Sequence, residues 1–337
     1  MNSFGSQLVF DLLDVSSVAV VRRAGAALAR ELKFSELRSG QLALVITEAA
    51  TNILKHAGEG QILLRILGEG ENAGIEVIAL DKGPGIENMD WHSEDGNSTA
   101  GTYGIGLGAL RRQSQRCEIY SASGKGTVLW LIVWADDESP VVSHWEIGAI
   151  CTPIKGEEVS GDNWAVCVHE DTLTLIVADG LGHGPDAAIA ANAAVKLCAE
   201  TADQSPGIIM QRAHSALYAT RGAAVAISQI HRDSEKLSFA GVGNIAVCIQ
   251  REQSNRHLIS HNGIVGSNVR KIQEFSEDWS GDALLIAHSD GVSTRWDISN
   301  YPGLEMCHPT LIAAVIYRDF SRGRDDATVV VVRESRG

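Results

Sequence analysis

The stretch "ADGLGHGPDAA" (residues 178–188) joins the end of a predicted strand to the start of a predicted helix. The apolar run before it ends in a single acid, Asp179, and three glycines and a histidine separate this acid from Pro185. Proline suits the first helical position, where its missing N–H is not needed. Because Gly180 has no side chain, the backbone carbonyl beside Asp179 can itself approach a metal ion. The stretch is therefore typical of a metal-binding strand end.

Three further acids lie at strand ends or turns in the same half of the chain: Asp162 in "SGDNW", Asp290 in "HSDGV" and Asp325 in "GRDDAT". Each one alone fits a turn, since Asp-Gly is a common hairpin signal. Buried carboxylates repel one another unless a cation lies between them, and a set without His or Cys favours Mg²⁺ or Mn²⁺ over zinc. The four acids together predict a divalent-metal site.

This order of motifs resembles the SpoIIE-type branch of the metal-dependent protein phosphatases, the protein phosphatase 2C superfamily, and within it the RsbX-type stress phosphatases. The resemblance covers roughly residues 143–335. It implies a β-sandwich flanked by helices (αββα) that hydrolyses phosphoserine or phosphothreonine with two Mn²⁺ or Mg²⁺ ions. It also implies roles for five residues: Asp179 is catalytic and bridges both ions, Gly180 lends its carbonyl, Asp290 and Asp325 hold the first ion, and Asp162 supports the second.

The first half of the chain contains a helix, capped by Ser35 and running to about Ala57, with polar residues along one face. In "ITEAATNILKHA" the apolar residues form one stripe, which leaves Glu48, Asn52 and His56 at a spacing of four along another face. Taken alone, this pattern fits a solvated polar face. A preceding helix is expected to be capped by Ser16 or Ser17.

Two glycine-rich stretches follow this helix in the sequence. In "DKGPGI" (81–86) the acid Asp81 ends a predicted strand, and "GTYGIGLGAL" (101–110) is a glycine-rich entry to another helix. Alternating glycines let backbone N–H groups and the positive helix end approach phosphates. An acid such as Asp81 can accept a hydrogen bond from an exocyclic amino group of a base. With Glu48 and Asn52, these stretches predict a nucleotide site.

The order of these features over roughly residues 8–134 resembles the GHKL ATPase superfamily, and most of all its RsbT-type serine kinases. The resemblance implies an α/β sandwich, with helices on one face of a mixed sheet, that binds ATP and Mg²⁺. It implies that Glu48 activates the attacking group and that Asn52 binds Mg²⁺. Asp81 would bind adenine with support from Thr127, in a loop shaped by Gly83 and Gly85. Three glycines would face the phosphates: Gly104, Gly106 and Gly108.

The length and composition favour a two-domain α+β protein that works in the cytoplasm. The chain has 337 residues and a net charge of −14, with 42 acids against 28 bases, so nucleic acid is not expected as a partner. No apolar stretch is long enough to span a membrane, and the six cysteines are scattered as in a reduced protein. An acidic, proline-containing stretch divides the chain into domains 1–136 and 144–337 with a linker at 137–143.

Together the two resemblances imply a bifunctional signalling enzyme of a bacterial partner-switching stress response. The first domain would phosphorylate a serine or threonine of a STAS-domain regulator, either an anti-sigma-factor antagonist or a stressosome-type protein, and the second would remove such phosphates. In the alternative, the first domain is a nucleotide-dependent binding module for a STAS protein or a sigma factor, and the phosphatase is the sole activity.

Overall fold

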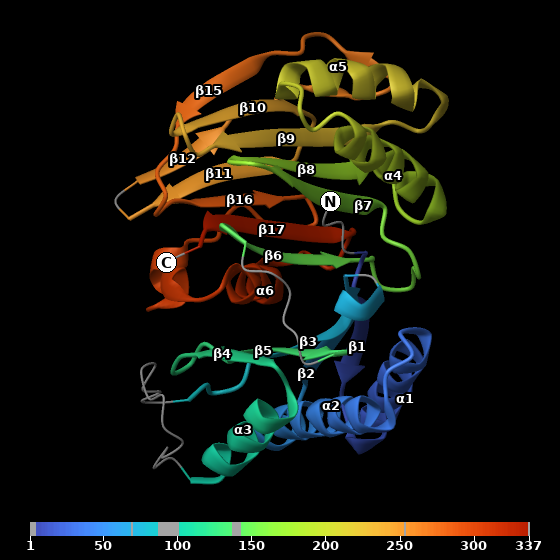
Figure 1. The fold of residues 1–337 in the computed structure, drawn as a ribbon, viewed down its shortest axis with the longest axis vertical. Helices are drawn as coiled ribbons and strands as arrows, with labels where there is room; N and C mark the ends of the chain where they lie inside the picture. Colours follow the sequence, from blue (N-terminus) through green and yellow to red (C-terminus); the bar gives the residue numbers. More distant parts are fainter. Residues whose placement is uncertain (1–4, 69, 87–100, 137–142, 253, 336–337) are drawn as a thin grey trace. The chain divides into compact units, whose positions relative to one another are not determined.

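The computed structural model describes residues 5–68, 70–86, 101–136, 143–252 and 254–335, and it confirms the predicted two-domain α+β class (Figure 1). The chain forms two compact units. The first comprises Gln7–Val142 together with Asp297–Arg318, and the second comprises Ser143–Trp296 and Asp319–Gly337 with the first six residues. The domain limits at 136 and 144 remain predictions. This division also shows that Asp297–Arg318, near the C-terminus, packs with the N-terminal part of the chain.

The first unit contains a five-stranded sheet in the order β1-β2-β3-β5-β4. All four strand pairings are antiparallel, whereas a mixed sheet was predicted. Strands β3 and β4 do run in the same direction, but β5 lies between them, so no parallel pair forms. The elements in chain order are β1 (Leu8–Leu12), α1 (Val15–Glu31), α2 (Glu36–His56), β2 (Gly60–Leu67), η1 (Gly70–Asn72), β3 (Gly74–Asp81), α3 (Gly101–Gln113), β4 (Arg116–Ser121) and β5 (Thr127–Trp134).

Helices α1 and α2 cover one face of this sheet, as predicted. Apolar side chains from both helices, such as Ile46 of α2, form one core with alternate residues of the strands, such as Ile75 of β3 and Leu131 of β5. Helix α2 is capped by Ser35, whose Oγ accepts a hydrogen bond from the N–H of Arg38. The cap of α1 is Asp14 rather than Ser16 or Ser17, because the Asp14 carboxylate accepts from both of their N–H groups.

The second unit is a sandwich of two five-stranded sheets, as predicted. Their strand orders are β15-β10-β9-β8-β7 and β12-β11-β16-β17-β6. Inward residues of both sheets share one core, in which Trp164, Phe239 and Leu285 are fully buried. The strands are β6 (Trp145–Thr152), β7 (Asp162–His169), β8 (Thr172–Gly180), β9 (Ala223–His231), β10 (Lys236–Val242), β11 (Ala246–Arg251), β12 (Ser254–Leu258), β13 (Gly263–Ile264), β14 (Asn268–Val269), β15 (Glu274–Asp278), β16 (Leu284–His288) and β17 (Ala327–Glu334).

Helices α4 (Pro185–Glu200) and α5 (Pro206–Ala216) cover the outer face of the first of these sheets. Small residues of α4, such as Ala190, Ala191 and Ala194, are fully buried, so this helix can approach the strands closely. Helix α6 (Pro309–Phe320) follows the short turns η3 (Ile298–Asn300) and η4 (Leu304–Met306). In the described part of the chain, no helix is both long and apolar enough to cross a membrane.

Candidate functional site

Two of the predicted metal-site acids lie opposite each other at one end of a sheet in the second unit. Asp162 is the first residue of β7, Asp179 is near the end of β8, and the strand register pairs them directly. The hairpin between these strands turns at the far end, so the beginning of β7 and the end of β8 lie side by side. The structure therefore brings together two acids that are 17 residues apart in sequence, as the register shows.

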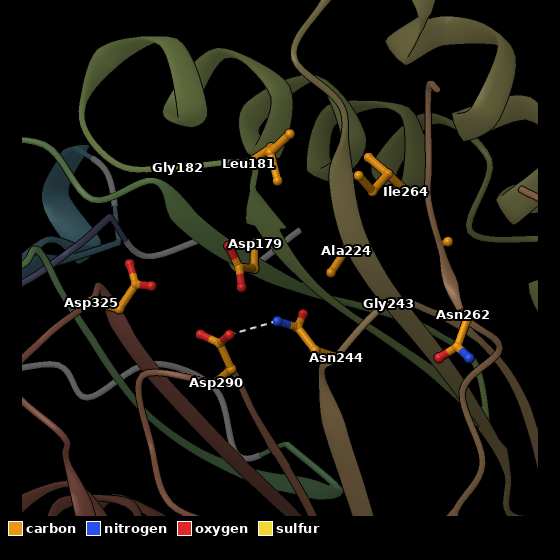
Figure 2. Close-up of a pocket in the computed structure, with 11 residues that line it drawn as sticks. Asp179, Leu181, Gly182, Ala224, Gly243, Asn244, Asn262, Ile264, Asp290 and Asp325 are labelled. Atoms are coloured by element: carbon orange, nitrogen blue, oxygen red, sulfur yellow. Dashed lines mark hydrogen bonds between the residues drawn. The ribbon is translucent and has the colours of Figure 1, made fainter. Parts of the chain in front are cut away.

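The other two acids come from the second sheet. Asp290 follows β16 and Asp325 precedes β17, and these strands are antiparallel neighbours, so both acids lie at the same sheet end. Asp179, Asp290 and Asp325 line a cavity of about 430 Å³. Figure 2 shows their three carboxylates facing a common space, with Nδ2 of Asn244 donating to Oδ2 of Asp290 over 2.6 Å. The sandwich thus gathers three of the four predicted acids around one cavity.

Repulsion and burial disfavour the charged forms of these carboxylates. Burial and the neighbouring carboxylates, Asp162 first among them, raise the pKa of Asp179 to about 9. Burial also raises the pKa of Asp162 to about 7. The pKa of Asp290 is raised by burial and by Asp325, although Arg322 and Asn244 oppose the shift. A bound cation would relieve this repulsion.

The chemistry of this set fits a hard divalent ion. Oxygen donors predominate, and Oδ2 of Asp162 is buried and accepts no hydrogen bond from any residue that the structure describes. Among the described residues, however, no three His, Cys, Asp or Glu side chains are arranged to hold one ion. The acids converge on the cavity without forming a closed ligand shell. Any ion bound here would complete its shell with water, as Mg²⁺ commonly does.

Gly180 has a packing role beside its predicted contact with a metal. A Cβ at this position would lie 2.0 Å from the carbonyl oxygen of Ala187 in α4. The N–H of Gly180 donates to the carbonyl of Gly161 over 3.0 Å. Glycine is therefore required where the first turn of α4 crosses the end of β8, and its carbonyl as a metal ligand stays a prediction.

The acids next to the predicted ligands have partners of their own. Asp326 accepts from the N–H groups of Ile154 and Gly161, over 2.7 Å and 2.8 Å, and so holds the loop before β7. Glu157 accepts from Nδ1 of His183 at 2.8 Å, and the His183 side chain is largely exposed. These contacts give Asp326 and Glu157 structural roles in the loop before β7.

Sequence reasoning missed two amides that line the cavity, Asn244 and Asn262. Asn244 lies in the turn between β10 and β11, in "GVGN", and Asn262 precedes β13. The only sequence signal was a glycine-rich turn followed by an amide, which any hairpin can carry. The fold makes them relevant because it turns these loops toward the acids (Figure 2).

In the first unit, Glu48 and Asn52 lie one turn apart on α2 and next to α3. A Cβ at Gly106 would lie 3.5 Å from Nδ2 of Asn52 and 3.8 Å from Oε2 of Glu48. The space beside Gly106 is thus bounded by an amide and a carboxylate. These are ordinary van der Waals distances, so α3 lies in contact with both groups at Gly106.

The loop after β3 is organised by Asp81. Its Oδ1 accepts hydrogen bonds from the N–H groups of Gly83, at 2.8 Å, and Thr127, at 3.2 Å. Burial raises the pKa of Asp81, although these two bonds oppose the shift. Gly85 has a φ of +72°, and a Cβ there would lie 2.0 Å from the carbonyl oxygen of Ala122. The structure therefore groups Asp81, Gly83, Gly85 and Thr127 at one end of the sheet.

The glycines of the "GTYGIGLGAL" stretch lie inside a helix. Helix α3 begins at Gly101, so Gly104, Gly106 and Gly108 fall in its first turns rather than in a loop before it. The segment 87–100, which precedes this helix, lies outside the described residues. Contact of these three glycines with phosphate stays a prediction.

Comparisons with known proteins match both units. The family model of the histidine kinase-like ATPase domain matches residues 13–133, and that of stage II sporulation protein E (SpoIIE) matches residues 169–334. The serine/threonine-protein kinase RsbT of Bacillus subtilis (strain 168) is 34% identical over 117 residues, which are 35% of this chain and 88% of that protein.

Two solved structures share part of the fold. A structure described under "The bacterial stressosome: a modular system that has been adapted to control secondary messenger signaling" is 28% identical, with a TM-score of 0.53, and covers 57% of this chain and 100% of its own. The structure of RsbX in complex with magnesium is 20% identical, with a TM-score of 0.52, and covers 58% of this chain and 98% of its own. The second likeness shows the fold alone.

Proposed function

Because the chain belongs to the RsbT-type serine/threonine kinase family in its N-terminal part and carries a SpoIIE-type phosphatase region after it, we propose that it is a bifunctional enzyme of partner switching. The N-terminal domain transfers the γ-phosphoryl group of ATP to a serine or threonine of a STAS-domain protein. The C-terminal domain hydrolyses such a phosphate. Both reactions take place in the cytoplasm.

The convergence of Asp179, Asp290 and Asp325 on one cavity is the observation that carries the phosphatase assignment. Together with Asp162 and the Gly180 carbonyl, these acids would hold two Mn²⁺ or Mg²⁺ ions. Such ions supply a nucleophilic water at neutral pH and stabilise charge on the phosphoryl oxygens. The chain's own contribution is to hold the carboxylates at the sheet ends, where Asn244 orients Asp290.

The pairing of Glu48 with Asn52 beside Gly106 supports the kinase assignment. In this proposal Asn52 binds Mg²⁺, Glu48 accepts the proton of the attacking hydroxyl, and Asp81 with Thr127 recognises adenine. Both N–H bonds go to Oδ1 of Asp81, so in this proposal the base binds Oδ2. A domain that only binds nucleotide can carry the same carboxylate at Glu48, so a direct measurement of phosphotransfer distinguishes a kinase from a binding module.

The substrate is a STAS-domain antagonist of an anti-sigma factor or a stressosome-type protein, and a sigma factor is a second candidate partner. The support for this substrate class is the kinship with RsbT and the likeness to a structure described as a bacterial stressosome. A net charge of −14 argues against nucleic acid as a partner.

The test is to incubate the protein with labelled ATP and candidate STAS proteins, and to follow label on the substrate with and without Mn²⁺. We expect label to appear with Mg²⁺-ATP and to disappear when Mn²⁺ is added and ATP is removed. Hydrolysis of a phosphorylated STAS protein that persists undiminished in an Asp179→Asn variant would overturn the phosphatase assignment.

The alternative is a nucleotide-dependent binding module joined to a phosphatase. The Glu48→Ala variant separates the two readings. Loss of phosphotransfer by at least about 10²-fold with unchanged ATP affinity supports the kinase, since Glu48 would act as a general base. Absence of phosphotransfer in the unmutated protein, with intact ATP binding, supports the module.

A further inference from the structure

The second face of the first unit's sheet, opposite α1 and α2, is buried. Alternation along the strands places on this face Leu63, Arg65, Glu76, Ile78, Leu80, Tyr120, Val128, Trp130 and Ile132, all of which are buried. Helices α1 and α2 cannot cover them, because these helices pack on the other face. The segment Asp297–Arg318, far along the sequence, belongs to the same compact unit as this sheet.

Aromatic and cationic contacts fix this segment, Asp297–Arg318, on the sheet. The His308 ring stacks on Trp130 of β5, with 4.2 Å between ring centroids. The ammonium of Lys125 lies 4.9 Å from the centroid of the Tyr301 ring. Two separated points of the segment are therefore anchored on β5 and on the turn before it, and α6 follows directly after them.

Arg318, near the end of α6, reaches the backbone of the predicted adenine-binding acid. Its Nη1 donates to the carbonyl oxygen of Asp81 over 3.0 Å, across 237 residues of sequence. The side chain lies among tightly packed backbone, because a Cβ at Gly126 would be 2.1 Å from that same oxygen and 3.0 Å from Nη1 of Arg318. Arg318 is only 8% exposed, so its position is set by packing as well as by this bond.

We propose that Arg318 is a positioning residue of the adenine site, supplied to the kinase-like domain by the C-terminal part of the chain. This rests on the proposed binding of ATP by the first domain. The guanidinium holds the carbonyl of Asp81, and the N–H groups of Gly83 and Thr127 hold its carboxylate. Backbone and side chain of the same residue are thus fixed independently, which sets the direction of Oδ2, the oxygen that would bind the base.

Arg318 also lies close in sequence to the predicted metal-site acids of the second unit. It lies between Asp290 and Asp325 in the sequence, seven residues before Asp325. The segment that contacts Asp81 is therefore continuous in the chain with two predicted metal-site acids. The positive charge of Arg318 also lowers the pKa of Asp81, against the larger opposing effect of burial. The charge of Arg318 thus favours the carboxylate form of Asp81, which accepts the amino group of adenine.

The test compares ATP with inosine triphosphate, which carries a carbonyl oxygen in place of the amino group that Asp81 would bind. Affinities of the full-length protein for both nucleotides are measured with Mg²⁺ by competition against a fluorescent ATP analogue. Arg318→Met keeps an unbranched apolar stem and removes the guanidinium donor. We expect it to lower the preference for ATP roughly five- to tenfold, the loss of one charge-assisted hydrogen bond, with unchanged affinity for inosine triphosphate.

Arg318→Lys retains a cationic donor, so it is expected to restore the preference to within about threefold of the unmutated protein. Arg295→Met, a substitution of an exposed arginine, serves as the matched control and should change neither affinity. An unchanged preference in Arg318→Met, or an equal loss of both affinities, overturns the positioning role. If the unmutated protein binds no adenine nucleotide, the proposed ATP site falls and this role falls with it.

Discussion

At the scale of single residues, glycine positions decide how closely elements approach one another. Gly180 allows the first turn of α4 to lie against the end of β8, next to Asp179. We predict that Gly180→Ala destabilises the protein by about 2–4 kcal/mol, because the new methyl group would overlap the carbonyl of Ala187 and displace α4. Phosphatase activity should fall with it. Guanidinium unfolding monitored by circular dichroism measures the change.

The matched control for this prediction is the same substitution at Gly40, in helix α2. A Cβ there meets no atom within 4 Å, so Gly40→Ala should stabilise the helix by up to about 1 kcal/mol. Equal and small effects at both positions would show that the contact between β8 and α4 tolerates a side chain. The predicted role of Gly180 in packing would then be wrong.

At the scale of elements, a buried ion pair fixes the second face of the first unit's sheet. Nη2 of Arg65 on β2 lies 2.7 Å from Oε2 of Glu76 on β3, and Nε1 of Trp130 donates to Oε1 of Glu76 over 3.0 Å. We predict that Glu76→Gln lowers the free energy of unfolding by about 3 kcal/mol, because it leaves the buried Arg65 guanidinium without its counter-charge. Denaturant unfolding of the purified protein checks this.

An exposed pair on neighbouring strands provides the comparison. Lys236 of β10 and Asp278 of β15 are paired across the strands, and both side chains are largely exposed. Asp278→Asn is expected to leave the unfolding midpoint unchanged within error, since solvent screens such pairs. A midpoint shift as large as that of Glu76→Gln would contradict the argument that burial makes the difference.

Patterns in the sequence were sufficient to predict some of these elements and not others. The Ser35 cap, the course of α2 and the acids at the ends of β7 and β8 follow from local chemistry and alternation, and the structure agrees with them. The position of β5 between β3 and β4 depends on pairing between strands far apart in sequence, which periodicity does not encode. The start of α3 at Gly101 was missed because glycines normally mark helix ends.

Of the candidate sites, the acids were predictable because strand ends concentrate them in short motifs. Asn244, Asn262 and Arg318 were not, because each lies in an unremarkable stretch and becomes relevant only through tertiary contacts. Arg318 is the extreme case, since its partner is 237 residues away. The structure groups Arg318 with Asp81 in one compact unit, which a linear division of the chain does not anticipate.

At the scale of the whole molecule, the first unit is completed by a segment that follows most of the second in sequence. We predict that a fragment ending at residue 142 exposes the sheet face of Ile78 and Trp130 and is less stable than the same domain in the full chain. Increased fluorescence of an apolar dye such as ANS, and a lower midpoint of unfolding, would reveal it. A fragment as stable as the intact domain, with no dye binding, would show that Asp297–Arg318 is dispensable for its fold.

The carboxylates around the cavity of the second unit set how the whole molecule responds to divalent ions. Their burial, and after it their mutual repulsion, works against folding when no cation is bound, and together these raise the pKa of Asp179 to about 9. Ions that bind only the folded chain should therefore stabilise it by about 2.7 kcal/mol at a hundredfold excess over Kd, seen as a rise in Tm of several degrees with Mn²⁺. Chelation should reverse the rise.

Asp179→Asn replaces an acid whose pKa of about 9 keeps it protonated at neutral pH by an amide of the same size that cannot ionise. Without added ions we expect the variant to be at least as stable as the unmutated protein at neutral pH, because an amide needs no proton uptake on folding. We expect it to lose most of the Mn²⁺-dependent rise in Tm together with hydrolysis. Glu158→Gln, at an exposed acid on the loop before β7, should keep both the rise and the activity. Calorimetry with and without Mn²⁺ separates these outcomes, and a full Mn²⁺ response in Asp179→Asn would mean that the ions bind elsewhere than at the cavity formed by Asp179, Asp290 and Asp325.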